Sequence, residues 1–151
     1  MKTVSRIAPI ALRIVFGFIF AAAGAAGLLQ LAPQQPLAGA AGAFMGGLAA
    51  TGYFFPVLKV VELGAGLLLL SGRFVPLALV VLAPIVLNIA AFHFLLAPEG
   101  ALMAAFLLLA EAGLAWFHRA AFAPLFRAVS TPRAEERAHA PATFDTQASQ
   151  A

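Results

Sequence analysis

Cysteine is absent from this sequence of 151 residues. Without a thiol, the chain forms no disulfide, holds no thiolate-bound metal and passes no electrons through its own cysteines. Charged residues are also scarce, at 10%, whereas about a quarter of the residues in an average soluble domain are charged. A redox role would therefore need a bound ligand or cofactor.

Apolar residues make up 63% of the chain, and the mean hydropathy is +0.99. So few polar residues could not cover so apolar a core in water, and we expect the lipid bilayer to be the solvent. The formal charge is +3, but the basic residues stand singly and have no aromatic platform beside them. Nucleic-acid binding is therefore not expected.

Four segments are apolar over the roughly 20 residues that a helix needs to cross a bilayer. Pro9 and Pro56 support two of the helix starts, because the first helical turn needs no N–H from its residues. The turn signals SGR (71–73) and PEG (98–100) separate the later spans. The sequence thus predicts an all-α integral membrane four-helix bundle. Its spans are residues 7–29, 54–71, 74–97 and 101–117.

An uncharged connection, residues 30–53, joins the first two spans. Its second half, residues 39–52, is apolar but too short to cross, which predicts an interfacial or re-entrant helix on the outer face. This helix could roof a cavity; a Gly/Ala-rich interfacial loop without a gating role is the plainer alternative. Residues 1–127 then form the membrane domain, and the polar residues 128–151 form a disordered cytoplasmic tail.

Lysine and arginine occur before the first span, between the second and third, and after the fourth, and this distribution predicts that both termini are cytoplasmic. Alternatively, the first span is a cleaved signal peptide, because small residues at 21–27 follow a basic start and an apolar run. Arg13 interrupts that run and favours a retained span. The basic residues on the cytoplasmic side are Lys2, Arg6, Arg73, Arg119, Arg127, Arg133 and Arg137.

Lys59 and Glu62 are two charges within the second apolar span. Together with Gly66 they share one helix face through their i, i+3 and i+4 spacing, so the pair can partly neutralise itself while it faces the bundle. An intramembrane carboxylate is a functional candidate by default. Two structural alternatives stay open: Lys59 could snorkel to the outer interface, and the pair could serve helix packing alone.

The third span contributes Asn88 and His93 to the same outer half. On a straight helix they lie about 140° apart. They would face one point only with a kink at Pro84, a rotation or a wide cavity. Asn88 could instead be an interhelical hydrogen bonder, and His93, between Phe92 and Phe94, could belong to an aromatic belt.

Arg13 and Glu111 lie deeper, toward the cytoplasmic side. Their simplest interpretation is a buried ion pair that fixes helix register, and the alternative is a role in proton or anion movement. Arg13 shares its helix face with a stripe of small residues, which we expect to face other helices because it lets backbones approach closely. The stripe consists of Gly17, Ala21, Gly24 and Gly27.

No soluble catalytic motif is present. The histidines at 93, 118 and 139 lack the spacing and companion ligands of a zinc site, and the glycine-rich segments lack the order of a phosphate loop. We therefore expect no metal.

Three stretches together resemble the DoxX family of small four-helix bacterial membrane proteins. They are LRIVFGFIFAAAG (12–24), FFPVLKVVELGAGLLLLSGRFVPLALVVLAP (54–84) and NIAAFHFLLAP (88–98). The resemblance covers roughly residues 5–127. It implies a multi-pass protein of the bacterial inner membrane that is linked to redox metabolism, since relatives include a membrane subunit of thiosulfate:quinone oxidoreductase. The matching polar residues are Arg13, Lys59, Glu62, Asn88 and His93.

These observations lead to one favoured hypothesis and two alternatives. The favoured one is an outer-half cavity that binds a quinone or another small apolar ligand, with Glu62 and Lys59 in the catalytic role and His93 and Asn88 binding the ligand. The alternatives are a transporter of protons or a small solute, and a non-catalytic anchor for a soluble oxidoreductase subunit. The sequence leaves open whether the chain forms a homo-oligomer.

Overall fold

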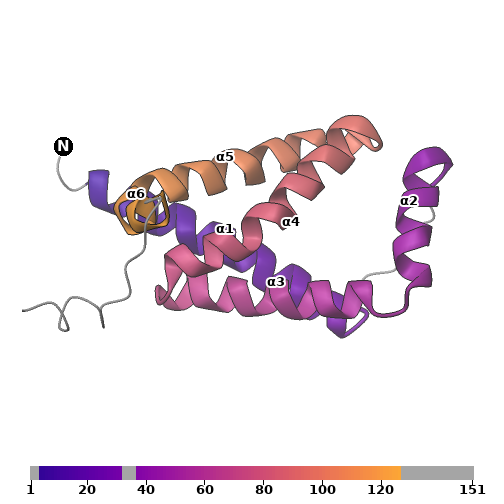
Figure 1. The fold of residues 1–151 in the computed structure, drawn as a ribbon, viewed down its shortest axis with the longest axis horizontal. Coiled ribbons are helices and arrows are strands. Elements are labelled where there is room, and N and C mark those ends of the chain that lie inside the picture. The colour runs from indigo at the N-terminus through magenta and orange to yellow at the C-terminus, as the bar shows by residue number, and fades with distance from the viewer. Residues whose placement is uncertain (1–3, 32–36, 127–151) are drawn as a thin grey trace, which may run out of the picture. The chain divides into compact units, whose positions relative to one another are not determined.

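The protein is described by a computed structural model over residues 4–31 and 37–126. Throughout this part of the chain every regular element is helical, which confirms the all-α prediction. Four long helices and the shorter α2 (Gly39–Ala50) make up most of these residues, and Figure 1 shows how they are arranged. The long helices are α1 (Val4–Leu28), α3 (Phe54–Ser71), α4 (Val75–Leu95) and α5 (Ala101–Phe117).

Among the described residues, four helices are long and apolar enough to cross a membrane. Their spans agree with the predicted ones to within a few residues, and the second matches at both ends. Large apolar side chains face outward from them; Leu102 is 86% exposed and Leu109 is 72% exposed. Such surfaces are costly in water and are expected in lipid. The spans are Ile7–Leu28, Phe54–Ser71, Val75–Leu95 and Pro98–Phe117.

The turns between the later helices are short, as predicted. α3 ends at Gly72, whose φ of 71° is the left-handed conformation that glycine adopts without strain at a helix C-terminus. The PEG turn is a 3₁₀ helix, η1 (Pro98–Gly100), between α4 and α5. Pro84 lies inside α4, which continues through it to Leu95.

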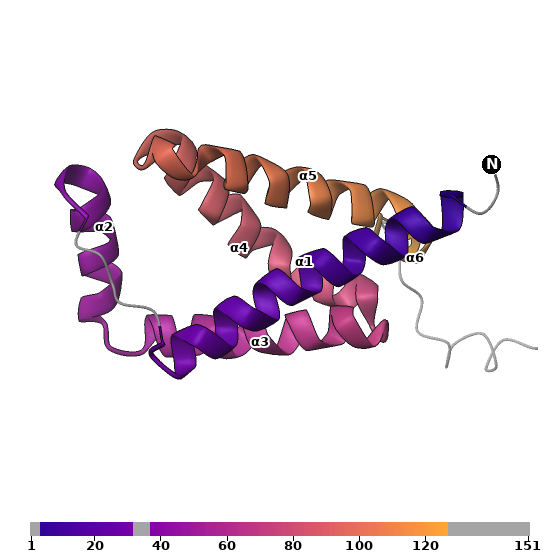
Figure 2. The ribbon, with the colours of Figure 1, turned by 180° about the vertical axis from the view of Figure 1, so that it is seen from behind.

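α1 and α3 form the most extensive helix contact in the described residues, and they cross in Figure 2. Glycines make the approach possible: a Cβ atom on Gly24 would lie 2.5 Å from the backbone nitrogen of Leu63. A Cβ atom on Gly66 of α3 would collide with the backbone of Ala21 in α1. The small-residue stripe of the first span was predicted to face other helices, and the helix that it faces is α3.

The remaining helices complete a bundle around one apolar core. α4 packs against α3 and α5, and α5 also contacts α1. Each of the four long helices contributes a fully buried large side chain to this core, because its apolar residues recur at helical spacing on the inward face. These side chains are Phe16, Leu69, Leu82 and Leu114, each 0% exposed.

The contacts divide the chain after Ala121 into two units. The first unit contains α1 to α5. α6 (Arg119–Phe122) crosses the division, and η2 (Ala123–Phe126) belongs to the second unit. The predicted tail, residues 128–151, and four of the basic residues used for the orientation (2, 127, 133 and 137) lie outside the described residues.

Candidate functional site

A cavity of 430 Å³ lies among α2, α3 and α4. All four residues that the sequence placed in an outer-half site line it: Lys59 and Glu62 from α3, and Asn88 and His93 from α4. The rest of the wall is mainly aromatic and aliphatic. The fold thus brings the predicted polar residues together around one apolar space.

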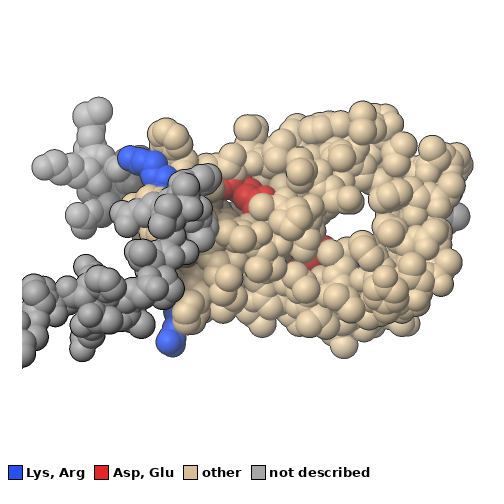
Figure 3. Space-filling model, viewed as in Figure 1, with Lys and Arg blue, Asp and Glu red and all other residues tan. Residues whose placement is uncertain are grey.

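The short helix α2 supplies one wall of this cavity through Phe44, Met45 and Leu48. The ring of Phe44 lies 5.8 Å from that of Phe92 in α4, centre to centre. Figure 3 shows an opening between the part of the molecule that carries α2 and the rest, with acidic atoms at its edge. The sequence had predicted a helix at this point. Its aromatic contact with α4 gives it a defined place at the site.

Thr51 fixes the turn that leads from α2 into α3. Its hydroxyl donates a 2.7 Å hydrogen bond to the carbonyl of Leu48 and accepts a 3.2 Å hydrogen bond from the backbone N–H of Phe54. The same side chain therefore closes the end of one helix and satisfies a free N–H at the start of the next. This links the end of α2 to the start of α3, the helix that carries Lys59 and Glu62.

The ammonium of Lys59 lies 2.7 Å from Oε2 of Glu62, and this is the one salt bridge within residues 4–31 and 37–126. The Glu62 side chain is 4% exposed and that of Lys59 is 25% exposed. Glu62 is buried because it shares its face with Ala65, Gly66 and Leu69, the side of α3 that packs into the bundle. A carboxylate in that place needs the ammonium as its partner.

Gly27 of α1 makes room for the Lys59 side chain. A Cβ atom on Gly27 would lie 2.5 Å from Cδ and 2.7 Å from Cγ of Lys59. The aliphatic stem of Lys59 thus passes over the end of α1, while its ammonium turns to Glu62. The structure therefore favours the pairing of Lys59 with Glu62 over the snorkelling alternative, in which the ammonium would only extend to the membrane interface.

His93 is held at the end of α4 by its own backbone. Its Nδ1 lies 3.0 Å from the carbonyl oxygen of Ala97, and because a carbonyl only accepts, Nδ1 carries the proton and donates. A Cβ atom on Gly100 would collide with the Nδ1 edge of the ring, so Gly100 makes room for it. In the neutral imidazole, Nε2 is then a hydrogen-bond acceptor. Nε2 is therefore the ring nitrogen that is left for a ligand.

Asn88 is exposed in this chain and lines the cavity one turn after Pro84. The sequence left open how Asn88 and His93 could face one space. The structure shows that two neighbouring i, i+4 rows of α4 face the cavity, so that Asn88 lies on one row and His93 on the other. The cavity is wide enough to take both rows, and no local break at Pro84 is required.

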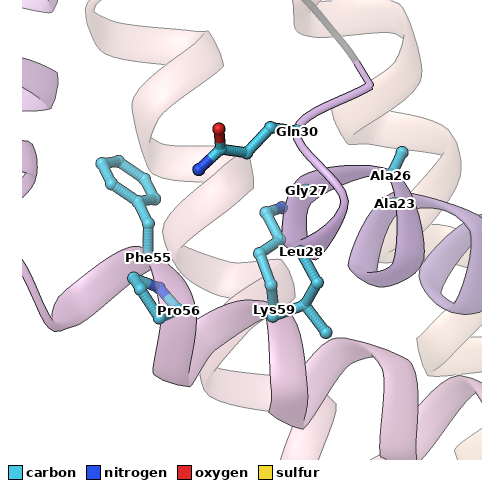
Figure 4. Close-up of a pocket in the computed structure, with 8 residues that line it drawn as sticks. All are labelled: Ala23, Ala26, Gly27, Leu28, Gln30, Phe55, Pro56 and Lys59. Atoms are coloured by element: carbon cyan, nitrogen blue, oxygen red, sulfur yellow. The ribbon is translucent and has the colours of Figure 1, made fainter.

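A second and larger cavity, of 780 Å³, lies between the C-terminal end of α1 and the N-terminal end of α3. Figure 4 shows the Lys59 side chain between Pro56 and Leu28, with Phe55 to the left and Gln30 above. Phe55 and Lys59 line both cavities. The sequence analysis did not identify Gln30 and Phe55 as cavity residues. The one sequence feature that pointed to this region was Gly27, as a member of the small-residue stripe.

The expected ion pair between Arg13 and Glu111 is not formed in the structure. The guanidinium of Arg13 lies against Gly72, at the C-terminal end of α3, where the helix dipole favours a cation. Nε of Arg13 and Oε1 of Glu111 are both buried without a hydrogen-bond partner. Helix angle and depth could not reveal this, because they do not say toward which neighbour a long side chain extends.

The described residues contain no group of three or more histidine, aspartate or glutamate side chains that could hold a metal ion. Comparisons of the chain with protein-family models, curated proteins and solved structures find no match.

Proposed function

We propose that this chain is a membrane protein whose α2–α3–α4 cavity binds a small apolar molecule with hydrogen-bonding groups, with the head group of a quinone as the best-fitting class. The observation that carries the proposal is the convergence of Lys59, Glu62, Asn88 and His93 on one largely apolar cavity. Its volume of 430 Å³ falls within the roughly 300–1,000 Å³ of small-molecule sites.

Each requirement of such a ligand has a counterpart in the wall. An apolar ring needs aromatic and aliphatic surface, which Phe44, Leu48 and Phe92 supply. Its oxygens need donors, and Lys59 and Asn88 have them. A proton must also be exchanged when such a ligand changes its redox state, and the carboxylate of Glu62 is the group placed for that exchange.

The resemblance to the DoxX family supports the wider setting of the proposal. It favours a multi-pass protein of the bacterial inner membrane, with cytoplasmic termini, that works with a soluble oxidoreductase subunit. That partner would exchange electrons with the quinone, while this chain binds the head group and handles its proton.

Binding to the purified protein tests the proposal. The protein would be placed in lipid nanodiscs and titrated with decyl-ubiquinone in its oxidised and its reduced form, with native mass spectrometry after mild extraction as a second measurement. We expect saturable binding by wild type, and in Glu62→Gln a clear loss of affinity for the reduced form, whose hydroxyl can donate to the carboxylate. Glu99→Gln, which changes an exposed carboxylate outside the cavity, is the matched control. No saturable binding by wild type would reject the proposal.

Transport is the second candidate, and one observation favours it. Lys59 lines both cavities, so its pair with Glu62 stands between two spaces that a proton or small solute could occupy in turn. Liposomes that contain the protein and a trapped pH dye would show Glu62-dependent proton movement if this function holds. Proton fluxes equal to those of empty liposomes would reject it.

A further inference from the structure

We infer that the cavity prefers the reduced, hydroxyl-bearing form of its ligand, a hydroquinone, over the quinone with two carbonyls. This inference rests on the proposed function, because it concerns which member of one ligand class the same site selects. It follows from the hydrogen-bonding groups on the two walls.

Each wall that carries polar groups offers both a donor and an acceptor. On α3, the ammonium of Lys59 has three N–H groups, of which one is committed to Glu62, and the Glu62 carboxylate has further lone pairs. On α4, the amide of Asn88 can donate, and Nε2 of the neutral His93 ring accepts, because Nδ1–H is bound to the Ala97 carbonyl. The cavity therefore presents two mixed pairs of groups.

A hydroxyl group matches a mixed pair, since it donates one hydrogen bond and accepts others. A carbonyl oxygen accepts only, so it can use the donors of Lys59 and Asn88 but leaves the acceptors of Glu62 and His93 without a ligand partner. Where the bound ligand excludes water from such an acceptor, leaving the acceptor unpaired lowers affinity by about tenfold or more. The hydroquinone should therefore bind at least about tenfold more tightly than the quinone.

The backbone around His93 fixes which edge of its ring can face a ligand, and this supports the preference for the hydroquinone. Gly100 lets the Nδ1 edge lie against the η1 backbone, and the hydrogen bond to Ala97 holds that edge there. The opposite edge, with Nε2, is the one left to face a ligand. His118 offers a matched control, because its Nδ1 makes the same kind of bond, 2.9 Å to the carbonyl of Leu114, and it does not line the cavity.

The experiment compares three ligands that share one decyl tail: the hydroquinone, the quinone and the hydroquinone dimethyl ether. Affinities are measured anaerobically in nanodiscs, in mildly alkaline buffer, for wild type, His93→Phe and His118→Phe. We expect wild type and His118→Phe to favour the hydroquinone by at least about tenfold over both other ligands. His93→Phe should reduce that preference by weakening hydroquinone binding while it leaves quinone binding nearly unchanged.

The outcomes separate this inference from the proposed function. If quinone and hydroquinone bind equally, or the dimethyl ether binds as tightly as the hydroquinone, the preference is overturned while the ligand class stands. If none of the three binds, the proposed function falls and the inference falls with it. Should His93→Phe fail to fold, the ether comparison on wild type decides the matter without any variant.

Discussion

The ammonium of Lys59 donates a 2.7 Å hydrogen bond to Oε2 of Glu62, one helical turn further along α3. This contact explains how two full charges persist inside an apolar run. The carboxylate is almost completely buried and the ammonium is partly exposed, so the ammonium brings the compensating charge to a group that cannot reach water itself. The same pair forms part of the wall of the candidate site.

The first prediction is that Lys59 and Glu62 are energetically coupled. Lys59→Met leaves the carboxylate buried without its partner, which we expect to lower the free energy of unfolding by about 1–3 kcal/mol, less than for a fully buried pair because Lys59 is partly exposed. The double variant Lys59→Met/Glu62→Gln should be less destabilised than the sum of the singles. A double-mutant cycle of unfolding in detergent micelles measures the coupling, and additive effects would contradict it.

The second prediction concerns the α1–α3 crossing. Gly66→Ala places a methyl group against the backbone of Ala21, which cannot move aside as a side chain could, so we expect about 1–3 kcal/mol of destabilisation. Gly64→Ala is the matched control, because nothing lies within 4 Å of a Cβ atom there. Thermal unfolding of both variants in the same detergent is the measurement. Equal midpoints would show that the helices do not approach this closely.

The helices were predictable because their signals are local. Apolar runs of membrane length and turn residues predicted the four spans, and the bounds of α3 were predicted at both ends. Pro56 lies in the first turn of α3 as expected, whereas the expectation for Pro9 was wrong, because α1 begins at Val4 and Pro9 lies inside it. The joint location of Lys59, Glu62, Asn88 and His93 was harder to predict, because it depends on how α3, α4 and α2 pack. The direction of Arg13 could not be predicted, since a long flexible side chain selects among neighbours that only the tertiary structure supplies.

The third prediction follows from that direction. Since the Arg13 guanidinium lies at Gly72 and forms no ion pair with Glu111, Arg13→Gln and Glu111→Gln should act nearly independently. We expect their effects on the free energy of unfolding to add within about 0.5 kcal/mol. The cycle is measured by equilibrium unfolding in micelles. A coupling well above that value would show that the two side chains pair in the membrane.

The fourth prediction fixes the orientation. The chain has no cysteine, so a single introduced cysteine is the only thiol that can be labelled. With cytoplasmic termini, a membrane-impermeant maleimide should label Tyr53→Cys and Glu99→Cys in intact spheroplasts. Ser71→Cys and Ala121→Cys, at the other ends of the helices, should be labelled only after permeabilisation. The reverse pattern would invert the topology and place the cavity on the cytoplasmic side.

The last prediction separates the position of the Lys59 side chain from the stability of the bundle. Gly27→Ala puts a methyl group where the Lys59 stem lies, 2.5 Å from Cδ, and a flexible side chain can yield where a backbone cannot. The unfolding midpoint should therefore fall less than in Lys59→Met, because alanine offsets part of the loss by favouring a helix by up to about 1 kcal/mol over glycine. Lys59 should meanwhile lose its position beside Glu62 and become more reactive toward an acylating reagent.

Peptide mass spectrometry measures that reactivity against Lys2, the only other lysine in the sequence, with Gly64→Ala as the matched control. Unchanged acylation of Lys59 would mean that α1 does not hold its stem, whereas faster acylation together with weaker hydroquinone binding would tie the end of α1 to the ligand site.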